Sequence, residues 1–198
     1  MVRVAVMVSG GGTNLQAILD AKAAGRIPSA EIALVISNRK DAYALTRAEK
    51  AGVKGQWLPK MKAETIEQYG EKLLDVLKEN QIDFVVLAGF LMILPENVIK
   101  AYPEKIINIH PSLIPSFCGA GFYGLRVHEA ALEYGVKVTG ATVHFVNEIP
   151  DGGRIITQKA VYIQPGDTAE ILQKRVMEEA EWIILPEAVE NVAKMLEV

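Results

Sequence analysis

The chain lacks the features that mark secreted or membrane proteins. Its 198 residues include a single cysteine, Cys118, so no disulfide can form within the chain and a secreted disulfide scaffold is disfavoured. The apolar N-terminus has no basic start and no small-residue cleavage site, and no apolar run approaches the 18 residues of a membrane span. The sequence therefore predicts a cytoplasmic protein without a membrane partner.

The net charge of the chain is small. The 21 Lys and Arg residues against 24 Asp and Glu give a formal charge of -3, which provides no general attraction to nucleic acid. This balance favours a small-molecule partner or indicates no partner in particular. The sequence does not distinguish a monomer from a homodimer.

Apolar runs of strand length alternate with amphipathic segments through the first half of the chain. Strands are predicted at 2–8, 32–37, 56–58, 84–88 and 106–109, and helices at 14–24, 43–51, 65–80 and 95–101. Thr65 and Gln68 have the spacing of a capping box at the start of the third helix. Near-continuous apolar strands separated by helices are typical of a parallel sheet that is covered on both faces.

After His110 the pattern changes. A loop is predicted at 111–124, a helix at 125–134, and two strands of an antiparallel arrangement at 141–146 and 155–163, before a final helical region that runs from about 167 to 196. No repeat or linker divides the chain. We expect one α/β domain over 1–198, with a mostly parallel, Rossmann-like sheet and an antiparallel C-terminal part.

A glycine-rich turn, Ser9-Gly10-Gly11-Gly12-Thr13-Asn14, joins the first strand to the first helix. Glycines permit close backbone approach, and a helix N-terminus offers free N–H groups to an anion, so the turn predicts a phosphate site. A dinucleotide is disfavoured because Leu15 replaces the third glycine of its fingerprint and no carboxylate follows the second strand. A phosphorylated monomer such as a ribose 5-phosphate fits better; a tight turn without a ligand is the alternative.

Asn108 and His110 end an apolar run and lie two positions apart, so in a strand they share one face. An amide and an imidazole that face one cleft suit a reaction in which a carbonyl oxygen becomes negative. A nearby carboxylate, which we assign to Asp151, would hold the imidazole in its charged form. The alternatives are that Asn108 caps the strand, that His110 is a satisfied core histidine and that Asp151 belongs to a simple turn.

Other chemistries lack their motifs. The histidines at 110, 128 and 144 have no metal-ligand spacing, and no G-x-S-x-G elbow provides a serine nucleophile. The sequence thus predicts no metal, and carbonyl-transfer chemistry that uses Asn, His and Asp.

Five motifs occur in order along the chain: S-G-G-G-T-N-L, V-V-L-A-G-F-L, N-I-H-P-S-L-I-P, T-V-H-F-V and D-G-G. Together they closely resemble the phosphoribosylglycinamide formyltransferase family of the folate-dependent formyltransferase superfamily. The resemblance implies the formyltransferase fold, with a phosphoribosyl-binding half at 1–105 and a catalytic and folate-binding half at 106–198. It also implies 10-formyltetrahydrofolate as co-substrate and the glycyl amine of glycinamide ribonucleotide as acceptor, in purine biosynthesis.

The resemblance also assigns roles to residues. Asn108 and protonated His110 would donate hydrogen bonds to a tetrahedral oxyanion, while Asp151 keeps His110 charged. The phosphoribosyl group would be bound by Gly11, Gly12, Thr13, Asn14 and Glu181, the last of these matched across a one-residue gap in its helix. The folate would contact Leu91, Met92, Ile93, Leu94, Asn108 and Val146, with the loop around 114–124 flanking it.

Several positions depart from the family pattern. Met92 and Ile66 stand where basic residues are usual, and Lys60 or Lys62 are the candidates to replace the second. The loop 116–124 is longer than in the best-known family form, and Arg154 follows Asp151-Gly152-Gly153 in place of proline. These departures bear on how the acidic folate tail is held rather than on the chemistry.

Three other functions share features of this sequence. A 10-formyltetrahydrofolate hydrolase shares the Asn, His and Asp and has a similar loop, but it reads N-I-H-H-S and carries an N-terminal regulatory domain, whereas this chain opens on its first strand. A formyltransferase that acts on tRNA would need a basic surface and a further domain. A non-catalytic folate or nucleotide sensor would bind without turnover.

Overall fold

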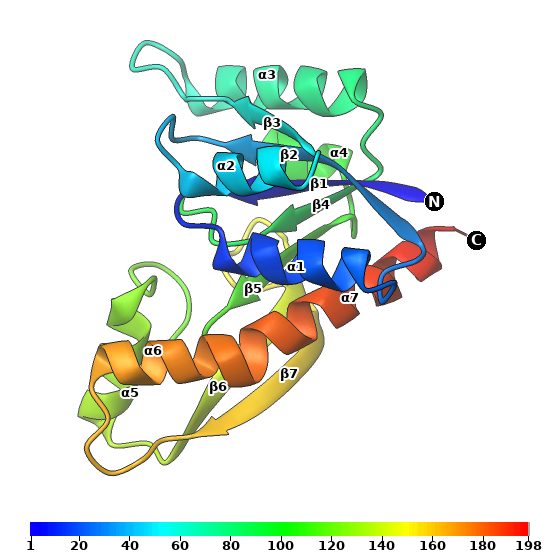
Figure 1. The fold of residues 1–198 in the computed structure, drawn as a ribbon. Helices are drawn as coiled ribbons and strands as arrows, with labels where there is room; N and C mark the ends of the chain where they lie inside the picture. The colour runs from blue at the N-terminus through cyan, green and yellow to red at the C-terminus, as the bar shows by residue number, and fades with distance from the viewer. Residues whose placement is uncertain (198) are drawn as a thin grey trace.

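The computed structural model describes residues 1–197, which contain one seven-stranded sheet in the order β3-β2-β1-β4-β5-β6-β7 (Figure 1). The first five strands pair in parallel, and β6 and β7 are antiparallel to their neighbours. This arrangement confirms the predicted mostly parallel sheet with an antiparallel C-terminal part. The strands are β1 (Val2–Val8), β2 (Ala30–Ser37), β3 (Lys54–Trp57), β4 (Phe84–Leu87), β5 (Ile106–His110), β6 (Val138–Phe145) and β7 (Ile155–Tyr162).

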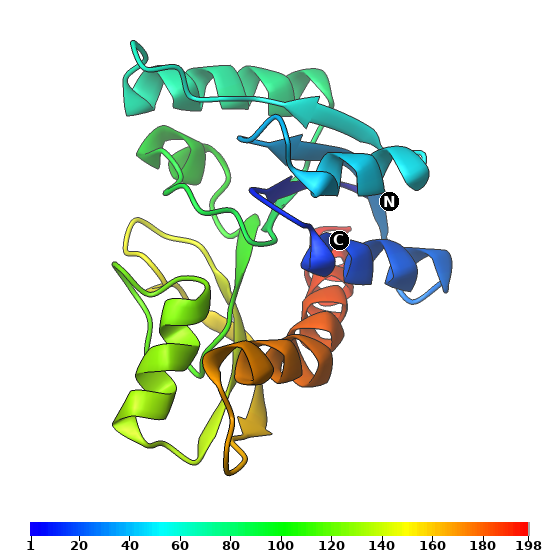
Figure 2. The ribbon, with the colours of Figure 1, turned by 60° about the vertical axis from the view of Figure 1, so that its left-hand side comes forward.

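Helices cover both faces of the sheet (Figure 2). One core cluster joins the sheet to α1, α2, α6 and α7, and the other joins it to α3 and α4. The helices are α1 (Thr13–Ala23), α2 (Tyr43–Lys50), α3 (Ile66–Glu79), α4 (Glu96–Ala101), α5 (Leu125–Tyr134), α6 (Ala169–Val176), the π-helical η1 (Met177–Glu181) and α7 (Trp182–Leu196).

The expected elements all occur, but several bounds differ. β2 begins at Ala30, β3 at Lys54 and β6 at Val138, each two or three residues before the predicted start. At these ends the backbone pairs with a neighbouring strand while polar or partly exposed side chains interrupt the apolar pattern. The capping box is present as predicted: Thr65 Oγ1 accepts a hydrogen bond from the Gln68 N–H and Gln68 Oε1 accepts one from the Thr65 N–H.

The strand order reverses between β1 and β4. The helix that follows β1 covers one face of the sheet and the helix that follows β4 covers the other, so their connections diverge at the carboxyl ends of these strands. Ligands of open α/β sheets bind in the crevice at such a switch point. The fold thus places the glycine turn after β1, residues 89–94 after β4 and the end of β5 around one opening.

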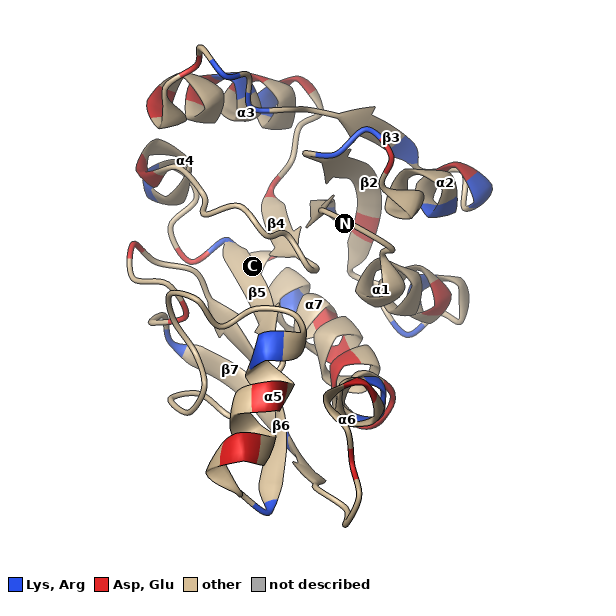
Figure 3. Ribbon diagram, turned by 90° about the vertical axis from the view of Figure 1, so that its left-hand side faces the viewer, with Lys and Arg blue, Asp and Glu red and all other residues tan. Residues whose placement is uncertain are grey.

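The surface matches the modest net charge. Figure 3 shows acidic and basic residues interspersed along the helices and loops. Within residues 1–197 we find no helix that is long and apolar enough to cross a membrane.

Candidate active site

A cavity of about 550 Å³ opens at this crevice. Its volume lies in the range of sites for drug-sized ligands. The structure brings to its wall the residues assigned to three separate roles by the sequence. They are Asn108, His110 and Asp151 for catalysis, Leu91, Met92, Ile93, Leu94 and Val146 for the folate, and Asn14 and Glu181 for the phosphoribosyl group.

Other predicted residues lie outside this wall. Gly11, Gly12 and Thr13 form the turn beside it; Thr13 lines a separate groove of about 310 Å³ on the outer side of α1. Gly12 has φ +72° and precedes α1, and a Cβ there would lie 2.6 Å from the Ala44 Cβ, so this position requires glycine.

Three positions that the sequence links to the folate tail, Ile66, Lys60 and Lys62, do not line the cavity. Ile66 is the first residue of α3 and does not line it. Lys60 donates to the Glu64 carbonyl, and neither it nor Lys62 reaches the wall. Among the described residues that line the cavity there is no lysine or arginine.

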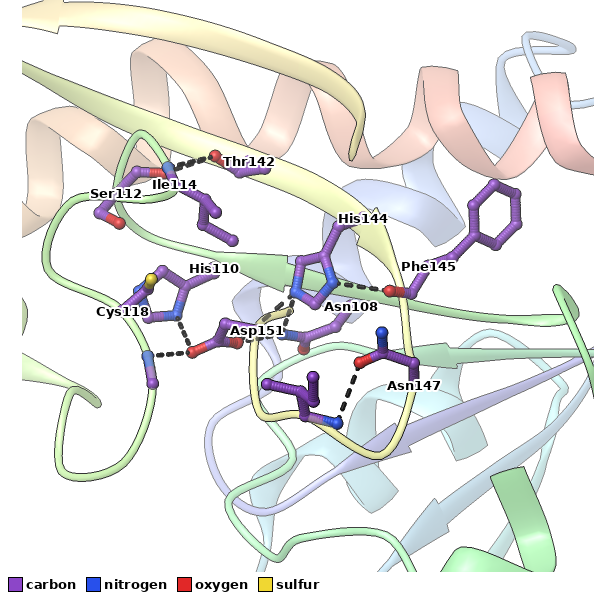
Figure 4. A network of polar contacts seen from close by, with 12 residues as sticks. Asn108, His110, Ser112, Ile114, Cys118, Thr142, His144, Phe145, Asn147 and Asp151 are labelled. Carbon is purple, nitrogen blue, oxygen red and sulfur yellow. Dashed lines mark hydrogen bonds and ion pairs between the residues drawn. The ribbon is translucent and has the colours of Figure 1, made fainter. Parts of the chain in front are cut away.

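Asn108 and His110 project from one face of β5, as their spacing predicts (Figure 4). Directly opposite Asn108 in the antiparallel pair with β6 stands His144, a residue that sequence reasoning left without a role. His144 Nδ1 donates to the Phe145 carbonyl at 2.8 Å, and its Nε2 lies 3.2 Å from the Asn108 Nδ2 amide. The Asp151 carboxylate faces the same Nδ2 end of Asn108, as expected for the N–H donor of the amide.

Asp151 lies where these side chains meet (Figure 4). Its Oδ2 accepts from the Gly119 N–H at 2.8 Å and lies 3.5 Å from His110 Nδ1, while its Oδ1 lies 3.5 Å from both Asn108 Nδ2 and His144 Nε2. Burial raises the pKa of Asp151, but His144, His110 and the Gly119 N–H together outweigh it and hold the pKa below its ordinary value. The carboxylate is therefore ionised at neutral pH.

The charge state of His110 differs from the sequence-based expectation. Burial lowers the pKa of His110 and outweighs the raising influence of Asp151 and of the Phe117 carbonyl, so the pKa lies below its ordinary value. A lowered pKa favours the neutral imidazole at pH 7, whereas the sequence-based expectation is that Asp151 keeps it charged. A sequence shows that a carboxylate is near but not how completely the imidazole is removed from water.

Asn14 and Glu181 form a second polar pair on the cavity wall. Asn14 Nδ2 donates to Glu181 Oε2 at 2.5 Å, and Asn14 Oδ1 is buried without a partner within residues 1–197. Burial raises the pKa of Glu181 to about 7. The π-helical turn η1 ends at Glu181.

Replacing Glu181 by Gln is expected to change how stability depends on pH. Unfolded chains lose this proton above about pH 4.5 and the folded protein holds it to about pH 7, so wild-type stability falls as pH rises through that window. The loss amounts to at most about 3 kcal/mol. Because glutamine does not ionise, the variant should gain that much relative to the wild type between pH 4.5 and pH 8, measured by urea unfolding.

Glu187→Gln is the matched control, since it removes an exposed carboxylate from the neighbouring helix α7. Its unfolding free energy should follow that of the wild type at each pH. Equal pH dependence in Glu181→Gln and wild type would mean that the buried carboxyl does not hold its proton.

His128 is a further residue on the wall that the sequence did not single out. It lies on α5 with its side chain fully buried, and neither ring nitrogen has a hydrogen-bond partner within residues 1–197. Burial lowers the pKa of His128 to about 4, so it is neutral at physiological pH. A lone histidine on a predicted helix carries no spacing signal that distinguishes this position from a surface site.

The loop 111–124 is tied to the sheet at its start and to the polar cluster at its middle. Thr142 Oγ1 donates to the Ser112 carbonyl and accepts from the Ile114 N–H, and the Ile114-Pro115 peptide is cis. The Phe117 carbonyl accepts from His110 Nε2 at 2.9 Å, which assigns a proton to that nitrogen. Residues 119–124 line the cavity; Ile114 does not.

Such a cluster suits stabilisation of negative charge. It combines the amide of Asn108 and the imidazole of His110, whose N–H groups contact polar atoms of the protein, with an ionised carboxylate, and all three line a partly apolar cavity. Donors fixed in advance act strongly on a developing oxyanion where water is excluded. Within residues 1–197, no group of three or more His, Cys, Asp or Glu side chains is arranged to hold a metal ion.

Comparison with known proteins places the chain in a family. A model of the formyl transferases matches residues 2–189, and the chain belongs to this family. A solved structure titled glycinamide ribonucleotide transformylase 1 from Symbiobacterium toebii superposes with a TM-score of 0.92 at 44% identity, covering 98% of this chain and 89% of that one.

Two relatives of similar identity carry a related name. The phosphoribosylglycinamide formyltransferase of Haemophilus influenzae is 42% identical over 187 residues, which are 94% of this chain and 84% of that protein. The chloroplastic phosphoribosylglycinamide formyltransferase of Arabidopsis thaliana is 42% identical over 178 residues, 89% of this chain. The chain spans only 61% of the length of that plant protein.

Proposed function

We propose that the protein transfers the formyl group of 10-formyltetrahydrofolate to the glycyl amine of N1-(5-phospho-D-ribosyl)glycinamide, a step of de novo purine (IMP) biosynthesis. The observation that carries the proposal is the meeting of Asn108, His110 and Asp151 at one end of a cavity. The wall includes the apolar side chains of Leu91, Leu94 and Val146, which suit a flat heteroaromatic ring, and Asn14 at the end of the glycine turn. The names of the relatives support the same reaction.

The amine nitrogen would attack the formyl carbon, and the formyl oxygen would become an oxyanion. Asn108 Nδ2–H donates to this oxygen, and so does His110 Nε2–H once the oxygen replaces the Phe117 carbonyl as its acceptor. Because a nearby negative charge raises an imidazole pKa, His110 takes up a proton from water as the oxyanion forms and returns it to water when the oxyanion collapses. The new C–N bond then remains while the bond from the formyl carbon to the folate nitrogen breaks. The proton lost by the attacking nitrogen is passed to that folate nitrogen, through water near the Asp151 carboxylate.

The two substrates would approach from opposite sides of this cluster. The phosphate would lie at the N–H groups of 11–14. The ribose hydroxyls would lie at the Asn14–Glu181 pair, where the buried Asn14 Oδ1 can accept a hydrogen bond from one of them. The folate ring lies against 91–94 and Val146. Since no lysine or arginine of the described chain lines the cavity, the acidic folate tail extends beyond it toward solvent.

Formyl transfer is tested by following loss of the formyl group from 10-formyltetrahydrofolate, with and without glycinamide ribonucleotide. We expect loss only when the ribonucleotide is present, with one formylated product for each folate consumed. Loss at the same rate without it would identify water as the acceptor, and the protein would then be a hydrolase. Binding of both ligands without turnover would identify a sensor.

The cytoplasm remains the predicted compartment.

A further inference from the structure

Helix α2 supports the glycine turn from the side away from the cavity, and Arg47 makes the central contact. Arg47 Nε donates to the Gly11 carbonyl at 2.7 Å, and its Nη1 donates to Gln16 Oε1 at 2.9 Å. The Ala44 N–H donates to the Gly10 carbonyl at 3.2 Å. One arginine thus joins the turn to the helix that follows it.

The contact with Gly11 fixes the direction of the next N–H group. In a trans peptide the C=O and N–H bonds point in opposite directions, so a Gly11 carbonyl held toward Arg47 turns the Gly12 N–H away from α2. Gly12 itself is confined, because its Cα hydrogens face Ala44 at a spacing that no side chain could occupy. Asn14, two residues later, already lines the main cavity. The contact with Arg47 thus sets the orientation of the peptide that carries the Gly12 N–H.

The arginine is itself held in place. Its guanidinium carbon lies 5.0 Å from the centre of the Tyr43 ring, a distance typical of cation–π contacts. With Nε and Nη1 both engaged, the planar group has one orientation. A lysine at this position could keep the charge but not the two-point contact.

We propose that Arg47 is a positioning residue for phosphate recognition, which holds the Gly11 carbonyl so that the N–H groups of the turn converge on the substrate phosphate. This inference rests on the proposed phosphoribosyl site. Arg47 reaches the phosphate through the backbone of Gly11, and its positive charge also favours an anion one peptide away. No spacing in the sequence links Arg47 to the turn, since 36 residues separate it from Gly11.

The test compares Arg47→Met with Arg26→Met in the complete chain. Both arginines line the groove on the outer side of α1, and both variants lose one positive charge, but Arg26 makes no hydrogen bond to the turn within residues 1–197. We expect Arg47→Met to raise KM for glycinamide ribonucleotide about tenfold or more, the scale of one hydrogen bond to a charged group. The kcat and the KM for the folate should stay within about threefold of wild type, and Arg26→Met should change each constant less than about threefold.

The phosphate-free substrate, glycinamide riboside, separates positioning from general damage. Its kcat/KM should be equal in wild type and Arg47→Met, because it has no phosphate for the turn to hold. An equal loss with riboside and ribonucleotide would overturn the proposal, and so would an unchanged KM for the ribonucleotide. Arg47→Lys, which retains the charge, should give an intermediate KM and provides the same comparison if Arg47→Met does not fold.

A binding measurement keeps this inference separate from the proposed reaction. Calorimetric titration with ribose 5-phosphate needs no formyl transfer, so absence of turnover in the wild type would remove the proposed reaction and leave this test in place. We expect Arg47→Met to bind ribose 5-phosphate about tenfold more weakly than Arg26→Met does. Equal affinities would show that Arg47 does not organise the turn.

Discussion

Asn108→Ala is expected to lose at least about 10²-fold in kcat while it still folds. Removing one donor to an oxyanion typically lowers rates about 10²- to 10³-fold, because the interaction exists mainly in the transition state. The KM values should change little, since Asn108 contributes one contact among many on the cavity wall. Steady-state kinetics with both substrates, after a circular dichroism check of folding, measures the effect.

Asn147→Ala is the matched control for this variant. Asn147 also lines the cavity, but its Oδ1 accepts from the Ile149 N–H of its own loop (Figure 4). We expect its kcat to remain within about threefold of wild type, the scale of a lost local contact. Near-normal turnover in Asn108→Ala would remove Asn108 from the catalytic residues and leave His110 to stabilise the oxyanion alone.

The family and the fold class were predictable from the chain, and both predictions are confirmed. Strands that are buried on both faces, such as β1 and β4, have apolar side chains at nearly every position, which makes their period easy to recognise. The edge strand β3 is less clear, because its residues are Lys, Gly, Gln and Trp; the sequence predicts strand only from residue 56, and backbone pairing with β2 places its start at Lys54.

The final helical region shows a different limit. The sequence predicts a single region, while the structure divides it into α6, η1 and α7. Pro186 has no N–H to offer the preceding turn of α7, and the irregular segment lies just before that turn. A side-chain pattern predicts helix here but does not distinguish a π turn from an α turn, although this turn decides where Glu181 points.

Within the site, strand alternation predicted that Asn108 and His110 share a face, and both line the cavity. The same alternation on β6 predicts which face His144 shares, but its contact with Asn108 depends on the register that pairs the two residues. That register is a property of two strands 36 residues apart in sequence, so neither strand alone contains it. The assigned roles themselves remain predictions that the variants test.

The second large effect is expected for Asp151→Asn, which keeps the shape of the side chain and removes its charge. Asparagine can still accept from the Gly119 N–H, so the loop contact survives. Loss of the carboxylate removes a charge that raises the pKa of His110, and the imidazole then becomes charged less readily as the oxyanion forms. We expect kcat to fall about 10²- to 10⁴-fold, as for aspartates that orient and support a catalytic histidine elsewhere.

Asp83→Asn serves as the control, because this exposed carboxylate accepts from the Arg3 N–H at the amino ends of the strands, remote from the cavity. It should leave kcat within about threefold of wild type. A kcat for Asp151→Asn within tenfold of wild type would mean that the negative charge is not needed in the transition state.

The pH dependence of the remaining activity distinguishes two routes by which Asp151 could act. If it acts through His110, protonation of the imidazole limits the variant, and its kcat should rise more steeply than that of wild type as pH falls from 8 to 6. The lowered pKa of His110 already places the wild-type protein on the neutral side of this equilibrium at pH 7. If Asp151 instead receives the proton from the attacking amine, low pH would not restore activity, because that route requires a base. If kcat of Asp151→Asn is instead lower than that of wild type by the same factor at every pH, Asp151 acts in the proton transfer and not through His110.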